Sequence, residues 1–367
     1  MMRELRVSIA VIVSLLVFIG VVMIYSSSGI YALQELGDDL YFLKRHLMFL
    51  CLGIVLMGGV MVMDYRDLRK LAKPMMIIAL VLLVAVLVPF IGREINGARR
   101  WFKFGPFLLQ PSEFAKLAVL IYVSDFLARK QNRVAHFWKG FVPVMGITGL
   151  TAALILKQPD LGTTLLIFTI SLMLLFVAGG RLEHIGALAL MVIPAFYFLI
   201  ARVPYRWTRI VTFLDPWRDS QGSGFQLVQS QIALGSGGLF GVGLGKSMQK
   251  LFYLPAAHTD FILSIVGEEL GFVGAFTIII LFSAFIWQGA RIVKRTNDPF
   301  GYFLSLGIVA MIGLQAVVNV GVSIGALPTK GLPLPFVSYG GSALVVNLMA
   351  VGLLLNISRI NDLSSHQ

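Results

Sequence analysis

The chain has 367 residues, of which 57% are hydrophobic and only 13% are charged, and its mean hydropathy is +0.86. A soluble protein of this composition would expose large apolar patches and aggregate, so the composition excludes a soluble domain and indicates an integral membrane protein with many spans. The formal net charge of +12 comes from Lys and Arg in short loops between apolar runs, a pattern of membrane proteins that requires no nucleic acid partner.

Ten apolar runs are long enough to cross the hydrocarbon core of a bilayer, which takes about 20 residues per helix. The first run is longer than the apolar part of a signal peptide and no cleavage motif follows it, so we expect it to be retained. The sequence therefore predicts an all-α, polytopic membrane domain covering residues 1–367. Its spans are expected at 8–27, 46–63, 74–91, 111–128, 140–156, 161–178, 185–201, 261–290, 301–322 and 341–358.

Ten spans place both termini on one side of the membrane. Lys and Arg are about equally numerous on the two sides, but the loops on the side of the termini are shorter and denser in basic residues, which assigns that side to the cytoplasm. Three longer loops, 92–110, 202–260 and 323–340, then lie outside. The loop 202–260, between the seventh and eighth spans, is too aromatic to be disordered, and we expect short amphipathic helices in it around 224–234.

The outer loop before the fourth span alternates basic and aromatic residues. Arg99, Arg100 and Lys103 alternate with aromatic residues that include Trp101. This pattern suits the headgroup layer of a membrane, where the alternative to ligand binding is a simple interfacial anchor.

Polar side chains also occur inside two spans. Glu113 and Lys116 lie three residues apart on the first turn of the fourth span, hence on one face, and such a pair must face the bundle interior or a wet cavity. A purely structural salt bridge is the alternative. Gln315 and Asn319, four residues apart on the ninth span, are expected to hydrogen-bond between helices.

Two further acids stand at the outer ends of spans. Asp160 precedes the sixth span, and Asp260 precedes the eighth. A carboxylate at a membrane boundary is costly to desolvate, so it needs a partner, a proton or a substrate. Alternatively, Thr259 or Asp260 caps the helix that starts at Phe261. Paired carboxylates can share a proton or bind a divalent cation.

A glycine-rich run, GSGGLFGVGLGKS, begins at Gly235 and is superficially like a phosphate-binding loop. Nucleotide binding is excluded because Phe240 stands where such a loop needs glycine, no buried strand precedes it, and the run is predicted to lie outside the cell. A backbone nest for a lipid pyrophosphate, assisted by Lys246 and Lys250, is the alternative.

Several stretches carry a resemblance to a known family, in order along nearly the whole chain. They are GARRWFKFG, QPSEFAKLA, QPDLGTT, FLDPWRD with GSGFQLVQSQIALGSGGLFGVGLGKSMQK, LPAAHTDFI, GEELGFVG and LPTKGLPLPFVSYGG. Together they resemble the SEDS family, which includes FtsW, RodA and SpoVE. GLGKSMQK, GEELG and LPTKGL look more like the FtsW (division) branch than the RodA (elongation) branch, and they do not separate FtsW from SpoVE.

The resemblance implies a ten-span peptidoglycan glycosyltransferase of the bacterial cytoplasmic membrane, acting at the division septum. Such an enzyme polymerises lipid II into glycan strands that stay linked to undecaprenyl pyrophosphate. The resemblance also implies a complex with a class B penicillin-binding protein, the transpeptidase that crosslinks the new strand, and with other divisome proteins.

Matched motif by motif, the resemblance assigns the family's essential acid to Asp260 and its functional tryptophan to Trp101. Its cavity pair matches Glu113 and Lys116, and the acid of its QPDLG motif matches Asp160. This chain departs from the family pattern just before His258, where Pro-Ala-Ala-His replaces a common Pro-Glu-Ala-His and thereby lacks one acid.

This chemistry gives each candidate a role. The acceptor sugar's 4-hydroxyl must lose a proton, which a positioned carboxylate can accept, so Asp260 is the expected general base. The leaving lipid pyrophosphate needs cationic side chains or a divalent cation such as Mg²⁺ or Mn²⁺, which Asp260 could hold. Inversion from α to β is expected, because no second carboxylate is placed as a nucleophile. The candidates to bind substrate or order the loop are Arg99, Arg100, Lys116, Lys246 and His258.

Two other functions compete with polymerisation. Polar residues within spans also suit a lipid II flippase, but they concentrate at the outer ends, no inverted repeat is visible, and the cytoplasmic halves of the spans are largely apolar. A non-catalytic scaffold for a transpeptidase would leave Glu113, Lys116, Asp160 and Asp260 without a purpose.

Overall fold

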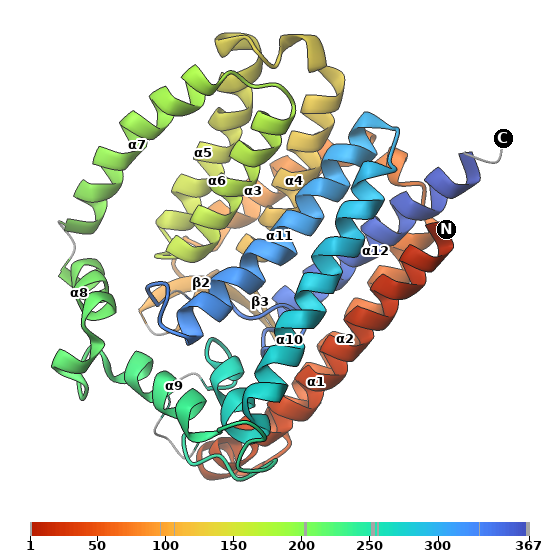
Figure 1. The fold of residues 1–367 in the computed structure, drawn as a ribbon. Coiled ribbons are helices and arrows are strands. Elements are labelled where there is room, and N and C mark those ends of the chain that lie inside the picture. The colour runs from red at the N-terminus through yellow and green to blue at the C-terminus, as the bar shows by residue number, and fades with distance from the viewer. Residues whose placement is uncertain are drawn as a thin grey trace.

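The computed structural model describes residues 2–95, 97–105, 107–201, 204–250, 254, 257–329 and 331–364, most of them in long helices (Figure 1). In chain order the helices are α1 (Met2–Leu36), α2 (Tyr41–Val62), α3 (Leu68–Ala85), α4 (Pro111–Arg129), α5 (Val142–Leu156), α6 (Leu161–Val177), α7 (Leu182–Ala201), α8 (Pro204–Leu214), α9 (Phe225–Ser236), α10 (Ile262–Lys294), α11 (Pro299–Ser323) and α12 (Gly341–Ser364). Short helical turns occur at Tyr65–Asp67, Gln131–Arg133, Phe137–Phe141 and Pro216–Asp219.

The predicted spans each coincide with one of these helices, and only α8 and α9 lie outside them. By length and composition, six helices among the described residues can cross a membrane: Met2–Leu36, Tyr41–Val62, Phe137–Leu156, Ile262–Lys294, Pro299–Ser323 and Gly341–Asp362. The all-α, multi-pass class is therefore confirmed, while the crossing of the remaining four helices stays a prediction. The short helix expected around 224–234 is confirmed by α9.

The sequence analysis places the third span at 74–91, which is too late in the chain. The helix α3 runs from Leu68 to Ala85 with Pro74 in its interior, so the proline does not begin it. Beyond Ala85 the chain turns back, and the backbone of Gly92 packs so closely on Val86 that a Cβ there would lie 1.8 Å from the Val86 carbonyl oxygen. Apolar composition continues to residue 91, but this tight turn ends the helix earlier.

The core of the bundle lies around α4, α11 and α12. The most apolar stretch of α12 is 83% buried and that of α11 is 67% buried, whereas that of α2 is only 17% buried. The inner helices therefore hold the polar residues, and α2 presents an apolar face that suits lipid. In Figure 1, α7 and α8 stand apart from the other helices.

Both termini lie at one end of the bundle, as the sequence predicts (Figure 1). An ion pair of 3.1 Å between Arg6 Nη2 and Asp362 Oδ2 joins α1 to α12 at this end. We call the opposite end, where α2, α4, α6, α10 and α12 begin, the site end. All the candidate site residues belong to it.

The loop 92–110 forms a small antiparallel sheet at the site end, which the sequence analysis did not predict. Its strands are β1 (Arg93–Ile95), β2 (Ala98–Phe104) and β3 (Phe107–Leu109), in the order β1-β2-β3. Ala98 and Phe102 of β2 are buried, as expected for one face of a half-buried strand, on which every second residue lies.

The glycine-rich run packs into a break in α10. Gly271 interrupts that helix with φ 69° and ψ −167°, and the freed amides of Phe272 and Val273 donate to the carbonyls of Gly238 and Leu239 at 2.8 and 3.1 Å. A Cβ on Gly271 would lie 2.4 Å from the Gly241 nitrogen, so only glycine permits this contact. The run thus fills a helix break by backbone pairing.

Candidate functional site

Asp260 lies in the turn that leads into α10. The helix begins at Ile262, and its N-cap is Phe261, whose side chain makes no cap hydrogen bond. The prediction that Thr259 or Asp260 occupies the N-cap position is therefore wrong, because Phe261 occupies it. The carboxylate of Asp260 faces the backbone of Gly331, with Oδ2 3.5 Å from the position of a Cβ on that glycine.

The end of α11 fixes the backbone of Asp260. The Asn319 amide donates to the carbonyl oxygens of Asp260 at 2.9 Å and of Leu332 at 2.8 Å. One side chain thus joins the turn before α10 to the extended segment that precedes α12. The helix–helix role that the sequence predicts for Asn319 becomes a helix-to-loop role, which holds the acid in place.

Glu113 and Lys116 of α4 form a buried ion pair. It meets α11 at Gln315, one helical turn before Asn319. The Lys116 Nζ lies 2.8 Å from Glu113 Oε2, and the two side chains are 1% and 3% exposed. Lys116 also donates to Gln315 at 3.4 Å, and Gln315 donates to the Pro333 carbonyl at 2.9 Å. The predicted interior position of the pair is confirmed, and α11 connects it to the segment beside Asp260.

Asp160 has a structural role at the start of α6. It is the N-cap of that helix, with Oδ1 accepting from the Thr163 amide at 3.0 Å. Its other oxygen accepts from Gln110 Nε2 at 3.4 Å, just before α4. This acid is 4% exposed, and its contacts tie two helix starts together.

The basic candidates of β2 make structural contacts. Arg99 pairs with Glu94 at 3.0 Å, and Arg100 donates to the carbonyls of Gln158 and Pro159, both at 2.6 Å. Of the two predicted roles, the geometry of Arg100 fits ordering of a loop. Trp101 is half-buried on the same strand, opposite Arg93 on β1.

Lys246 is exposed in the glycine-rich run. Its backbone amide donates to the Gly243 carbonyl at 3.2 Å. The amides of Val242 and Gly243 point to the carbonyls of Glu268 and Glu269 at 2.9 and 3.1 Å. A backbone nest needs free amides, so these bonds remove two of the donors on which a pyrophosphate nest in this run would depend.

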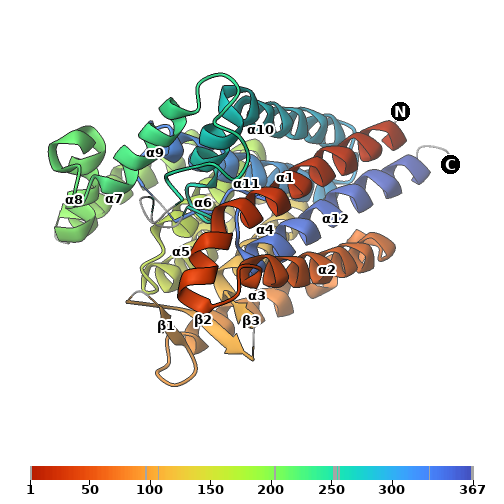
Figure 2. The same ribbon diagram turned by 90° about the horizontal axis from the view of Figure 1, so that it is seen from below.

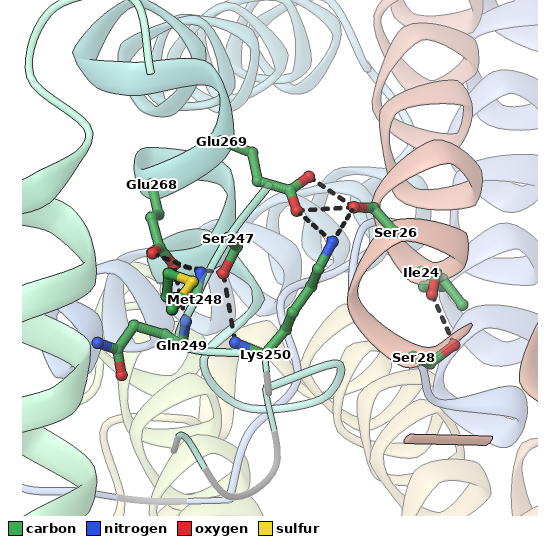
Figure 3. A network of polar contacts seen from close by, with 9 residues as sticks. All are labelled: Ile24, Ser26, Ser28, Ser247, Met248, Gln249, Lys250, Glu268 and Glu269. Carbon is green, nitrogen blue, oxygen red and sulfur yellow. Dashed lines mark hydrogen bonds and ion pairs between the residues drawn. The ribbon is translucent and has the colours of Figure 1, made fainter. Parts of the chain in front are cut away.

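A polar network that the sequence analysis missed anchors the following segment, residues 247–250 (Figure 3). Glu269 forms a buried ion pair with Lys250 at 2.9 Å and accepts from Ser26 of α1. Glu268 accepts from the Ser247 hydroxyl and, at 2.9 Å, from the Met248 amide. The signal was present, because two adjacent acids within an apolar run need partners.

His258 is packed among aromatic rings two residues before Asp260. Its ring centroid is 4.7 Å from that of Phe42, 5.8 Å from Tyr339 and 6.0 Å from Tyr31, and its carbonyl accepts from the Tyr339 amide at 2.9 Å. Burial lowers the pKa of His258 to about 4. It is therefore neutral at pH 7 and contributes no positive charge for an anionic substrate.

The acids do not gather into a metal cage. Among the described residues, no group of three or more His, Cys, Asp or Glu side chains could hold a metal ion. Glu113 faces Lys116 and Asp160 caps α6, which separates their roles from that of Asp260. The arrangement offers one carboxylate in a turn whose backbone the Asn319 amide holds.

Residues 6–363 match the family described as "Cell cycle protein", which comprises FtsW, RodA and SpoVE. The chain is 47% identical over 339 residues to the "Probable peptidoglycan glycosyltransferase FtsW" of Geobacter metallireducens, covering 92% of this chain and 90% of that protein. It is 45% identical over 351 residues to "Stage V sporulation protein E" of Bacillus subtilis, covering 96% of each chain.

Solved structures agree with the sequence match. A chain from "Structural coordination of polymerization and crosslinking by a peptidoglycan synthase complex" superposes with a TM-score of 0.79 at 33% identity, covering 96% of this chain and 97% of that one. The rod shape determining protein RodA of Thermus thermophilus superposes with a TM-score of 0.71 at 31% identity, covering 96% and 95%. The chain therefore belongs to the FtsW/RodA/SpoVE family, the SEDS proteins, and most resembles FtsW.

Proposed function

We propose that this protein polymerises lipid II into the glycan strands of the septal wall, with Asp260 activating the acceptor sugar hydroxyl. Its activity is that of a peptidoglycan glycosyltransferase, the activity for which its relatives are named. The observation that carries the role of Asp260 is its placement: the Asn319 amide fixes its backbone, and its carboxylate faces the backbone of Gly331 at the site end.

The chemistry follows from this placement. As the acceptor's 4-hydroxyl attacks the anomeric carbon, its proton passes to the Asp260 carboxylate, a contribution of about 10²–10⁴-fold in rate. The bond to the lipid pyrophosphate breaks, and cationic side chains of the site end stabilise the charge that develops on it. The ion pair of Glu113 and the cap formed by Asp160 leave neither acid placed as a covalent nucleophile, which favours inversion from α to β.

A divalent cation is compatible with this site. Mg²⁺ commonly binds one or two carboxylates together with substrate phosphates. Asp260 can supply one such ligand, and an ion held there would neutralise charge on the leaving pyrophosphate.

The proposed setting is a complex in the bacterial cytoplasmic membrane. One structural relative belongs to a synthase complex whose description names both polymerization and crosslinking. We infer that the partner of this chain is a class B penicillin-binding protein, the transpeptidase that crosslinks the new strand, together with other divisome proteins at the septum.

The space below Lys116 weighs against a flippase. A small cavity extends from Lys116 between α4, α6 and α11, and apart from Ser171 its other lining residues are apolar, among them Val119, Ile170 and Met311. A charged headgroup moving toward the cytoplasm would need polar partners along this path. A scaffold without catalysis leaves the buried Glu113–Lys116 pair unexplained, because a docking surface needs no buried charges.

The test is polymerisation of lipid II by the purified protein with its transpeptidase partner, comparing wild type with Asp260→Asn. We expect at least about a 100-fold loss of glycan chains with folding and complex formation intact. Asp38→Asn is the matched control, because Asp38 is a site-end acid paired with Lys44 outside the turn of Asp260. Retained polymerisation by Asp260→Asn would move the search for the base to Asp160 and Glu113. No polymer from the wild type would favour the flippase or the scaffold.

A further inference from the structure

A pocket of about 370 Å³ lies at the site end, between the first turns of α2 and the sheet. Figure 2 shows the sheet beside α2. This volume suits a small headgroup. The pocket has one wall from α2 and one from the sheet. Tyr41 and Arg45 line it from α2, and its lining from the sheet includes Arg93, Glu94, Lys103 and Leu108.

The pocket carries an excess of positive charge. Arg45, Arg93 and Lys103 supply three cations, and Glu94 is the one acid in the lining. The charge of Glu94 is compensated from outside the lining, because its carboxylate pairs with Arg99 at 3.0 Å. Within the described part of the chain, Arg45, Arg93 and Lys103 form no ion pair. Their charges are therefore available to an anion.

The floor of the pocket is ordered. The Arg45 guanidinium stacks on the Tyr41 ring at 4.3 Å from its centroid, and it lies beside the Tyr339 hydroxyl, where its charge opposes the rise in the pKa of Tyr339 that burial causes. The sheet wall is fixed as well, because the Ser342 hydroxyl at the start of α12 donates to the Leu108 carbonyl at 3.1 Å.

This floor connects the pocket to the proposed base. Tyr339 contacts Arg45 on one side, and its backbone amide donates to the His258 carbonyl at 2.9 Å on the other. His258 precedes Asp260 by two residues in the same turn. A ligand held by Arg45 is thus separated from the Asp260 turn by one layer of side chains.

We propose that this pocket binds the diphosphate of a lipid-linked substrate, an assignment that rests on the proposed function. Guanidinium groups match phosphate oxygens in paired hydrogen bonds, and Lys103 adds a point charge. Leu108 and Ile95 provide an apolar border for the start of the lipid chain. A phospholipid headgroup shares the phosphate chemistry, but it has one phosphate where a diphosphate offers more charge to three cations.

The test is direct binding of undecaprenyl diphosphate to the full chain in nanodiscs of phosphatidylcholine, which has no net charge. The variants are Arg45→Gln and the double variant Arg93→Gln with Lys103→Gln. Each is expected to weaken binding by about tenfold or more, with a smaller salt dependence. The double variant changes exposed side chains only, so its folding is not at risk. Lys44→Gln is the matched control, since Lys44 neighbours Arg45 but pairs with Asp38 at 2.8 Å outside the lining.

Several outcomes would overturn the assignment. Unchanged binding in both variants would overturn it, and so would equal weakening by Lys44→Gln. Competition by phosphatidylglycerol as strong as that by undecaprenyl diphosphate would make the pocket a general phospholipid site. Because binding is measured without turnover, a wild-type protein that binds the diphosphate but forms no glycan would overturn only the proposed polymerase activity. A failure of the proposed polymerase activity is therefore distinguishable from a failure of this pocket.

Discussion

The imidazole of His258 illustrates how a residue's surroundings override its usual chemistry. The sequence analysis names this histidine, two residues before Asp260, as a candidate to bind substrate or order the loop. In the fold, the rings of Tyr31, Phe42 and Tyr339 enclose it, and desolvation favours the neutral form. Its role at this position is packing, and it shapes the turn that carries Asp260.

This burial predicts a pH dependence of stability. Because the pKa of His258 is about 4 in the folded protein and 6.5 when exposed, unfolded chains bind a proton below pH 6.5 that folded chains refuse. His258 should therefore lower the stability as the pH falls from about 6.5 to about 4, and have no effect above that window. Melting temperatures from pH 7.5 to 4.5 should fall less for His258→Phe than for the wild type. His136→Gln, at an exposed histidine, is the control; equal slopes for His258→Phe and the wild type would contradict the argument.

At the scale of elements, α10 and the glycine-rich run form one unit. The break at Gly271 frees backbone groups that the run satisfies, while Glu268 and Glu269 hold the segment that follows. The last residue that this unit anchors is Lys250, ten residues before Asp260. A loop that crosses the membrane surface is thereby tied to α10 and α1 before it reaches the site.

The Lys250–Glu269 pair gives this unit a measurable energy. Both side chains are at most 3% exposed, so Lys250→Met leaves a buried charge without its partner and should lower the free energy of unfolding by about 3–5 kcal/mol. Adding Glu269→Gln should restore much of that loss, because the second change removes the orphaned charge. Thermal unfolding of the two single variants and the double variant measures the coupling. Lys70→Met, in the exposed pair with Asp67, should leave the melting temperature unchanged. Additive losses would show that the pair does not act as a unit.

At the scale of the whole molecule, local patterns predicted the helices and long-range contacts decided the site. Apolar runs located a helix for each predicted span, although α3 begins and ends earlier than predicted, and the spacing of Glu113 and Lys116 placed that pair inside. The sequence could not show that Asp160 would cap α6. Nor could it show that Arg100 would donate to the backbone carbonyls just before α6, since those partners depend on the fold. The roles of Arg45 and Arg93 were missed for the same reason, because α2 and the sheet meet only in three dimensions.

The orientation of the bundle in the membrane is the last expectation, and it rests on the density of basic residues in short loops. It predicts that the site end faces outward, as a polymerase of exported lipid II requires. In a Cys51→Ala background, a cysteine at Met248, which is 61% exposed at the site end, should react in intact cells with a thiol reagent that cannot cross membranes. A cysteine at Gln131, exposed between α4 and α5 at the opposite end, should react only after the membrane is opened. The reverse pattern would place Asp260 in the cytoplasm and remove polymerisation outside the cell as its function.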